Sequence, residues 1–176
     1  HLFPRAPRPD GFALADMQGA VLQRIEFVPL GGRRVLVLVV SRGNQVTQKV
    51  VDTGEDVRTA DLVQAANYLN TEFAGLALLD VREAVVARLQ QERTLYDELL
   101  GRALRLAQQS LEDLPSHPSF HVEGVASLLE EVDESVSRAT LRSLLQMMEE
   151  KERLVRLLNE YIDGPGLTVV IGVEHS

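Results

Sequence analysis

The spacing of apolar residues near the start of the chain is typical of strands. Residues 25–30 and 34–40 are two largely apolar runs joined by Gly31 and Gly32, which can adopt the positive φ of a tight hairpin turn. The second run has six consecutive apolar residues, a pattern typical of a central strand buried on both faces. Residues 44–52 then alternate polar and apolar side chains after a turn. This pattern predicts an antiparallel meander over 21–30, 34–41 and 44–52.

From Thr59 the apolar residues follow the spacing of a helix. Thr59 is a candidate N-cap, apolar residues recur every three or four positions from Leu62 to Phe73, and Gly75 is a candidate end. Asp80 with Glu83 resembles a capping box at the start of a second helix. Its apolar positions continue to 114, where prolines follow. Arg93 interrupts this stripe, so one kinked helix and two helices both fit.

The last third of the chain predicts further helices and a final strand. We expect a short strand at 120–122 and a short helix at 125–132. A helix from Ser137 carries a near-heptad apolar stripe to Ile162, which fits either the protein's own core or a seam with a second subunit. Gly164, Pro165 and Gly166 end this helix before a strand at 167–173. The element order predicts an α+β fold in which a helical segment is inserted between pieces of one antiparallel sheet.

Composition narrows the possible roles. The chain has no cysteine and a formal net charge of −8, and its arginines alternate with glutamates as on solvated helix surfaces. This charge argues against direct binding of nucleic acid by these residues. The sequence holds neither an apolar run long enough to cross a bilayer nor the apolar centre of a signal peptide. We expect a cytoplasmic protein without membrane contact.

Candidate catalytic and metal-binding groups do not form a recognisable site. His117 and His121 are four residues apart, but Pro118 lies between them and no third ligand is evident. Adjacent carboxylates at 130–131 and 149–150 point in different directions on a helix. Neither Ser41 nor Ser127 lies in a nucleophile motif, and the Gly-Gly pair lacks the lysine of a phosphate loop. We therefore expect no enzyme activity, no cofactor and no metal.

Eight segments, in order along the chain, carry a resemblance to a known family. They are RIEFVPL at 24–30, RVLVLVV at 34–40, NYLN at 67–70, FAGL at 73–76, VEG at 122–124, LL at 128–129, MEEKERL at 148–154 and GLTVVIGVE at 166–174. As an ordered set, the chain resembles the C-terminal part of the heat-inducible transcription repressor HrcA.

The resemblance implies a GAF-like domain with an inserted dimerising domain. It implies a lead-in over 1–20, a discontinuous GAF-like domain over 21–58 and 118–176, and a helical dimerising subdomain over 59–117. In that family a winged-helix domain binds an inverted-repeat operator before chaperone genes, and the GroE chaperonin keeps the repressor active. The implied role of this chain is homodimerisation and regulation.

The chain departs from the family pattern at both ends. No helix-turn-helix precedes the hairpin, and the sequence stops at Ser176, where family members continue with more sheet and helix. We therefore expect a fragment whose sheet has an unpaired edge.

The helices after residue 59 are our candidates for the intersubunit contact, because a small helical insertion has little core of its own. The candidate dimerisation residues are Leu62, Ala66, Leu69, Phe73, Val85, Leu89, Tyr96 and Leu99. An alternative from another functional class is a GAF-like sensor of a small molecule, which would need a polar-lined pocket.

Overall fold

A computed structural model describes residues 19–112 and 138–172. Its strands are β1 (Leu22–Gly31), β2 (Arg34–Ser41), β3 (Gln45–Asp52) and β4 (Thr168–Gly172). Its helices are α2 (Thr59–Phe73), α3 (Leu78–Glu112) and α5 (Arg138–Ile162). The strand predicted at 120–122 and the helix predicted at 125–132 lie outside the described residues.

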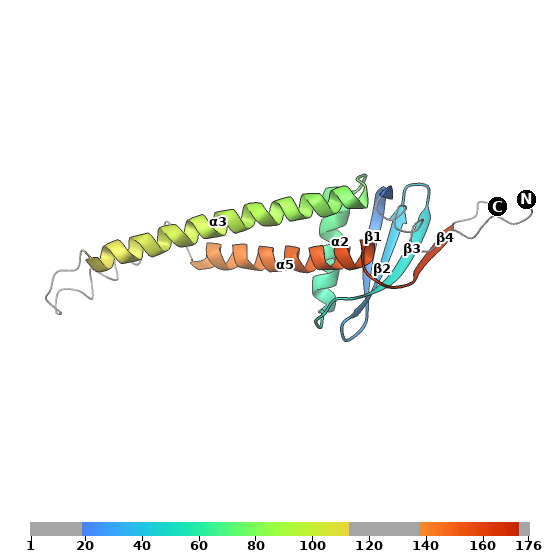
Figure 1. The fold of residues 1–176 in the computed structure, drawn as a ribbon, viewed down its shortest axis with the longest axis horizontal. Coiled ribbons are helices and arrows are strands. Elements are labelled where there is room, and N and C mark those ends of the chain that lie inside the picture. Colours follow the sequence, from blue (N-terminus) through green and yellow to red (C-terminus); the bar gives the residue numbers. More distant parts are fainter. Residues whose placement is uncertain (1–18, 113–137, 173–176) are drawn as a thin grey trace, which may run out of the picture. The chain divides into compact units, whose positions relative to one another are not determined.

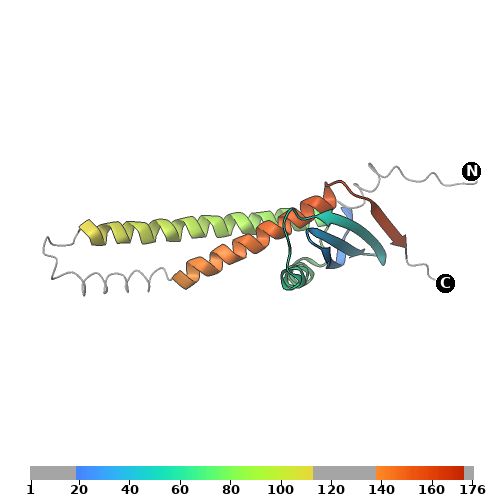
Figure 2. The ribbon, with the colours of Figure 1, turned by 90° about the horizontal axis from the view of Figure 1, so that it is seen from below.

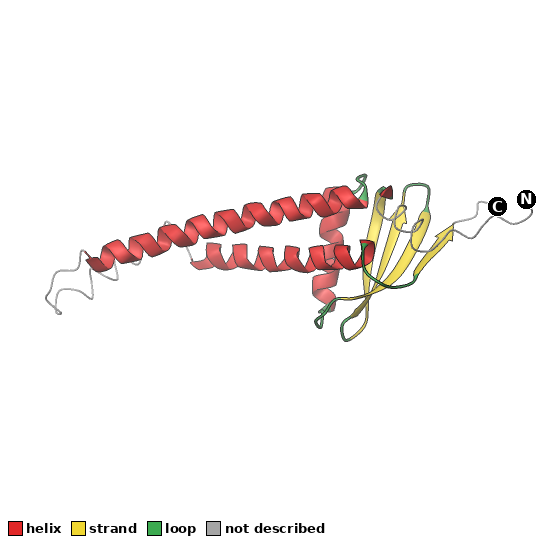
Figure 3. Ribbon diagram, in the orientation of Figure 1, coloured by secondary structure: helices red, strands yellow, loops and turns green. Residues whose placement is uncertain are grey.

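The strands form one antiparallel sheet in the order β1-β2-β3-β4 (Figures 1 and 3). The predicted meander is confirmed, and the hairpin turn has φ values of 101° at Gly31 and 60° at Gly32. The last predicted strand is confirmed as β4, which pairs with β3. The mixed helix and sheet content confirms the predicted α+β class.

One face of the sheet is buried and the opposite face is partly exposed. On the central strand β2, Val35, Val37 and Val39 are at most 1% exposed, whereas Leu36 and Leu38 are half-buried. The expectation that β2 is buried on both faces is therefore wrong for the described residues. The physical reason is that α2 and the sheet-proximal parts of α3 and α5 lie on one side of the sheet (Figure 1).

The starts of the first two helices differ from the prediction, whereas the end of α2 agrees with it. The N-cap of α2 is Arg58, which makes no side-chain cap hydrogen bond, so Thr59 is the first helical residue. Gly75 follows the helix with a φ of 94°, as a terminating glycine does. Helix α3 begins at Leu78, which places Asp80 in its first turn instead of at its cap. Arg93 is exposed, and α3 continues through it as a single helix.

The chain divides into two compact units. The first comprises His1–Ala87 and Glu150–Ser176, and the second comprises Arg88–Glu149. The first unit is discontinuous because α3 leads out of it and α5 leads back. The insertion predicted at 59–117 stays a prediction, and residues 59–87 are described with the sheet-containing unit. None of the helices in 19–112 and 138–172 is long and apolar enough to cross a membrane.

Asn70 on α2 covers the outer edge of β1. Its side-chain Oδ1 accepts a hydrogen bond from the Ile25 N–H at 2.8 Å, and its Nδ2 donates to the Ile25 carbonyl at 3.0 Å. The amide thereby replaces the neighbouring strand that an edge residue lacks. This pair of bonds fixes α2 in register with the sheet.

We expect Asn70→Ala to lower the free energy of unfolding by roughly 1–3 kcal/mol, because it leaves two half-buried backbone groups of Ile25 without partners. Urea denaturation measures the change. Asn67→Ala, at an exposed position one turn earlier on α2, is the matched control and should change stability by less than about 0.5 kcal/mol. Equal effects of the two substitutions would contradict this role of Asn70.

Candidate functional site

The structure separates the predicted dimerisation residues into two groups. Five side chains belong to the core of the sheet-containing unit, and each is at most 8% exposed. They are Leu62, Ala66, Leu69, Phe73 and Val85. Side chains so buried have little surface left for a second copy.

The other three predicted residues lie on the part of α3 that belongs to the second unit. Leu89 is 6% exposed, while Tyr96 and Leu99 are half-buried. They belong to a row of positions that are buried or half-buried and recur at alternating intervals of three and four. We call this row the inner stripe: Leu89, Glu92, Tyr96, Leu99, Ala103, Leu106 and Ser110. Such spacing is typical of one helix packing along another, and in this unit α3 and α5 run antiparallel (Figures 1 and 2).

A second apolar row runs beside the inner stripe and is more exposed. We call it the outer stripe: Leu100, Leu104, Ala107 and Leu111. Leu104 is 61% exposed and Leu111 is 67% exposed. A third row is polar and exposed throughout, at Glu98, Arg102, Arg105, Gln109 and Glu112. The exposed leucines of the outer stripe therefore form a line along one side of the helix.

Sequence reasoning missed the outer stripe. Its signal is a spacing of four, three and four residues from Leu100 to Leu111, which periodicity could have found. The apolar course predicted from the sequence follows the inner stripe alone, from Leu89 to Ser110, and omits all four residues of the outer stripe. Burial distinguishes the two rows.

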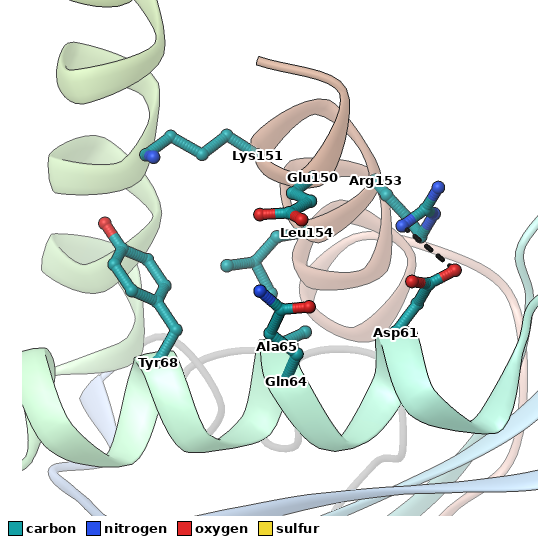
Figure 4. Close-up of a pocket in the computed structure, with 8 residues that line it drawn as sticks. All are labelled: Asp61, Gln64, Ala65, Tyr68, Glu150, Lys151, Arg153 and Leu154. Atoms are coloured by element: carbon teal, nitrogen blue, oxygen red, sulfur yellow. Dashed lines mark ion pairs between the residues drawn. The ribbon is translucent and has the colours of Figure 1, made fainter. Parts of the chain in front are cut away.

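A small groove lies between α2 and α5 in the sheet-containing unit (Figure 4). Tyr68 and Asp61 from α2 face Lys151 and Arg153 from α5, and the groove encloses about 90 Å³. Arg153 lies 3.5 Å from Asp61, and the Lys151 ammonium lies 5.3 Å from the centre of the Tyr68 ring. Small-molecule sites usually enclose about 300–1,000 Å³, so the groove is too small for a typical metabolite.

Ion pairs link the loop before α2 to α5. Arg156 lies 3.2 Å from Glu55, and Arg153 lies 4.0 Å from the same carboxylate. Both arginines belong to the part of α5 that returns to the sheet. Partly exposed pairs such as these stabilise weakly one by one. Within the described ranges, no group of three His, Asp or Glu side chains could hold a metal ion.

Lys49 on β3 is the one fully buried charged side chain among the described residues, at 3% exposure. Its ammonium donates hydrogen bonds to the carbonyl of Tyr161 at 3.0 Å and to that of Gly164 at 2.6 Å. Tyr161 lies in the last turn of α5, where the helix dipole favours a cation, and Gly164 lies two residues after the last helical residue. Desolvation lowers the pKa of Lys49, and the nearby charges of Glu160 and Asp163 oppose this shift.

Tyr161 packs beside this contact at the end of α5. The side chain is 1% exposed, and burial raises the pKa of its phenol despite a side-chain hydrogen bond with Thr47. Arg82, near the start of α3, pairs with Asp163 and also donates to Asn159 at 3.3 Å. The end of α5 is thus held both to the sheet and to α3.

Comparisons with known proteins agree on one family. Residues 12–176 match the family model described as HrcA protein C terminal domain. The chain is 36% identical over 165 residues to the heat-inducible transcription repressor HrcA of Geobacter sulfurreducens, which covers 93% of this chain and 47% of that protein. It is 35% identical over 156 residues to the same-named protein of Methylococcus capsulatus, with 88% and 44% covered.

A third relative gives the same picture. The chain is 32% identical over 169 residues to the heat-inducible transcription repressor HrcA of Xanthomonas campestris, covering 96% of this chain and 45% of that protein. The chain therefore spans about half the length of the curated relatives that it matches. No solved structure matches it.

The lowered pKa of Lys49 predicts a pH dependence of stability. The unfolded chain binds the Lys49 proton more tightly than the folded chain does, so folding becomes more favourable as pH rises from the lowered pKa toward 10.5. Above about pH 10 the buried phenol of Tyr161 acts in the opposite direction, because only the unfolded chain loses that proton readily.

We expect the free energy of unfolding of the parent, minus that of Lys49→Met, to increase between about pH 8 and pH 10. Urea denaturation at several pH values measures it, and the subtraction removes the contribution of groups common to both proteins. A difference that decreases over this range would mean that the folded protein favours the charged ammonium.

Proposed function

The chain belongs to the HrcA family, whose curated members are heat-inducible transcription repressors, and we propose that it forms the dimerising and regulatory part of such a repressor. The DNA-reading part would be a winged-helix domain outside these 176 residues. The net charge of −8 fits this division, because a surface that grips phosphates is usually basic.

The observation that carries the proposal is the exposed outer stripe on α3. Leu104 and Leu111 are each more than half exposed. Full burial of a leucine contributes about 1.5–3 kcal/mol, whereas association costs roughly 4–15 kcal/mol. The burial of two leucines from each copy therefore roughly offsets the free-energy cost of association. Leu100 and the half-buried Tyr96 and Leu99 would add to the contact. A second copy offers the complementary surface, because a two-fold axis brings the same stripe to both sides.

Dimerisation would determine how the operator is read. A two-fold pair of DNA-binding domains matches an inverted repeat only when the two domains are held at the spacing of its half-sites. Each copy alone would bind one half-site weakly. A loss of the dimer would therefore release the operator without any change in the contacts to bases.

Regulation by heat would act through this dimer. Following the family resemblance, we take the GroE chaperonin as the partner that keeps the repressor folded and active, in the cytoplasm. The sheet of the first unit would be the GAF-like domain. The alternative role, a GAF-like sensor of small molecules, has less support, because the groove beside Tyr68 and Lys151 encloses only about 90 Å³ and the larger hollow beside Arg42 and Gly75, of about 480 Å³, is more open to solvent.

Substitution of the outer stripe tests the proposal. We expect Leu104→Glu and Leu111→Glu each to weaken the dimer by on the order of 1,000-fold. Each substitution buries one carboxylate from each copy in the interface, and each buried carboxylate costs about 2 kcal/mol of binding free energy or more. Both positions are mostly exposed in the single chain, so the folded subunit should keep its stability. Sedimentation velocity over a concentration series measures the association.

Two control variants separate the stripe from a general effect of charge. Gln109→Glu places a carboxylate on the polar row of the same helix, and Val63→Glu places one at a 52% exposed apolar position on α2. Both should associate like the parent. The proposal fails if the stripe variants also dimerise like the parent, or if the parent is a monomer at micromolar concentration.

A further inference from the structure

We propose that Lys49 is a positioning residue that fixes the end of α5 on the sheet, within the sheet-containing unit, and that operator reading depends on this anchor. This inference rests on the proposed function, because the anchor matters for DNA only if α3 joins two copies. Under this inference, operator binding depends on two features. One is the apolar outer stripe of the second unit, and the other is the buried charge of Lys49 in the sheet-containing unit.

The hydrogen bonds of Lys49 depend on the direction of α5. The acceptors are two carbonyls three positions apart, Tyr161 at 3.0 Å in the last turn of α5 and Gly164 at 2.6 Å just after the helix. Apolar contacts beneath α5 tolerate small rotations, because they have no preferred direction. A rotation of α5 about its base would lengthen one or both hydrogen bonds and leave a buried ammonium without its acceptors. The buried charge therefore selects one orientation of the helix end.

The chain after α5 passes close to Lys49 at a glycine. A Cβ at Gly166 would lie 3.2 Å from Cε of Lys49 and 3.1 Å from the Val50 carbonyl oxygen, and φ at this glycine is 139°. A Cβ at Gly164 would lie 2.5 Å from the carbonyl oxygen of Glu160. Gly166 thus allows the chain after α5 to pass close to the lysine, and Gly164 allows it to pass close to Glu160.

The start of α3 is held at the same place. Arg82 pairs with Asp163, one residue before Gly164, and donates to Asn159 one turn earlier on α5. The helix that leaves the sheet and the helix that returns to it are therefore joined where both meet the core. Lys49 connects this joint to β3, and β3 lies inside the sheet between β2 and β4.

Distance measurements between two spin labels test the joint directly. The chain has no cysteine, so Gln45→Cys on β3 and Glu152→Cys, on the part of α5 that belongs to the same unit, create an exposed pair without background labelling. In the parent we expect one narrow distance distribution. In Lys49→Met we expect a distribution at least twice as wide, or one with a displaced maximum. Methionine keeps the length of the side chain and removes its donors.

The chain itself provides the control, because it has only one other lysine. Lys151→Met makes the same substitution on α5, at a side chain that lies over the Tyr68 ring and away from the Lys49 contact. Its distance distribution should match the parent. If Lys49→Met also matches the parent, the proposal is overturned.

Gly166→Ala gives an independent test if Lys49→Met fails to fold. The added methyl group would displace the lysine side chain by steric contact without removing its charge. We expect the same broadening, with a cooperative thermal transition seen by circular dichroism. A folded Gly166→Ala variant with the parent distribution would also overturn the proposal.

The consequence for DNA is tested in the full-length repressor. Binding is measured to operators whose half-site spacing is the natural one, or is changed by a few base pairs. We expect the parent to prefer the natural spacing, and Lys49→Met to lose at least tenfold of that preference while remaining a dimer. An unchanged preference in Lys49→Met would overturn the proposal that the contact between Lys49 and the end of α5 affects operator binding. Loss of dimerisation in the outer-stripe variants is measured separately, so failure of the proposed function is distinguishable from failure of this inference.

Discussion

The structure depends on the burial of one sheet face under helices that are distant in sequence. Val35, Val37 and Val39 of β2 lie in the same core as Leu157, Leu158 and Ile162 at the end of α5. These two groups are more than 100 residues apart, so the helical excursion must return to the place from which it left. Closure of a long loop costs entropy that grows slowly with its length, and the apolar area buried at its end must exceed that cost.

The return of α5 explains why the predicted dimerisation residues divide as they do. Helical periodicity identifies the apolar side of a helix but does not identify what covers it. Leu62, Leu69 and Val85 have the same spacing as Tyr96 and Leu99, yet the first three are covered by their own sheet and the last two are only half-buried. The strands were easier to predict, because Gly31 and Gly32 mark the hairpin and the apolar runs on both sides have the length of strands. The contacts of Asn70 and Lys49 join residues 45 and 112 or more positions apart, and no local pattern predicts them.

The second face of the sheet shows a different limit of sequence reasoning. A continuous apolar run predicts burial on both faces, and the run over 35–40 is correctly placed on a central strand. Some of the other residues on the outer face are also apolar, yet several of them remain more than a third exposed among the described residues. They are Val28, Val50, Val169 and Ile171. The run places apolar side chains on both faces of the sheet. In the described residues, helices cover only one of these faces.

Two kinds of interaction therefore have separate tasks in this domain. Apolar burial supplies most of the driving force, both in the core and, in our proposal, along Leu104 and Leu111 between copies. It leaves small rotations of packed helices nearly equal in free energy. A buried ammonium with two acceptors does not add much stability, since desolvation opposes it and lowers its pKa. Its contribution is directional: among the packed arrangements of α5, only those that keep both carbonyls within reach of Lys49 avoid an unpaired buried charge.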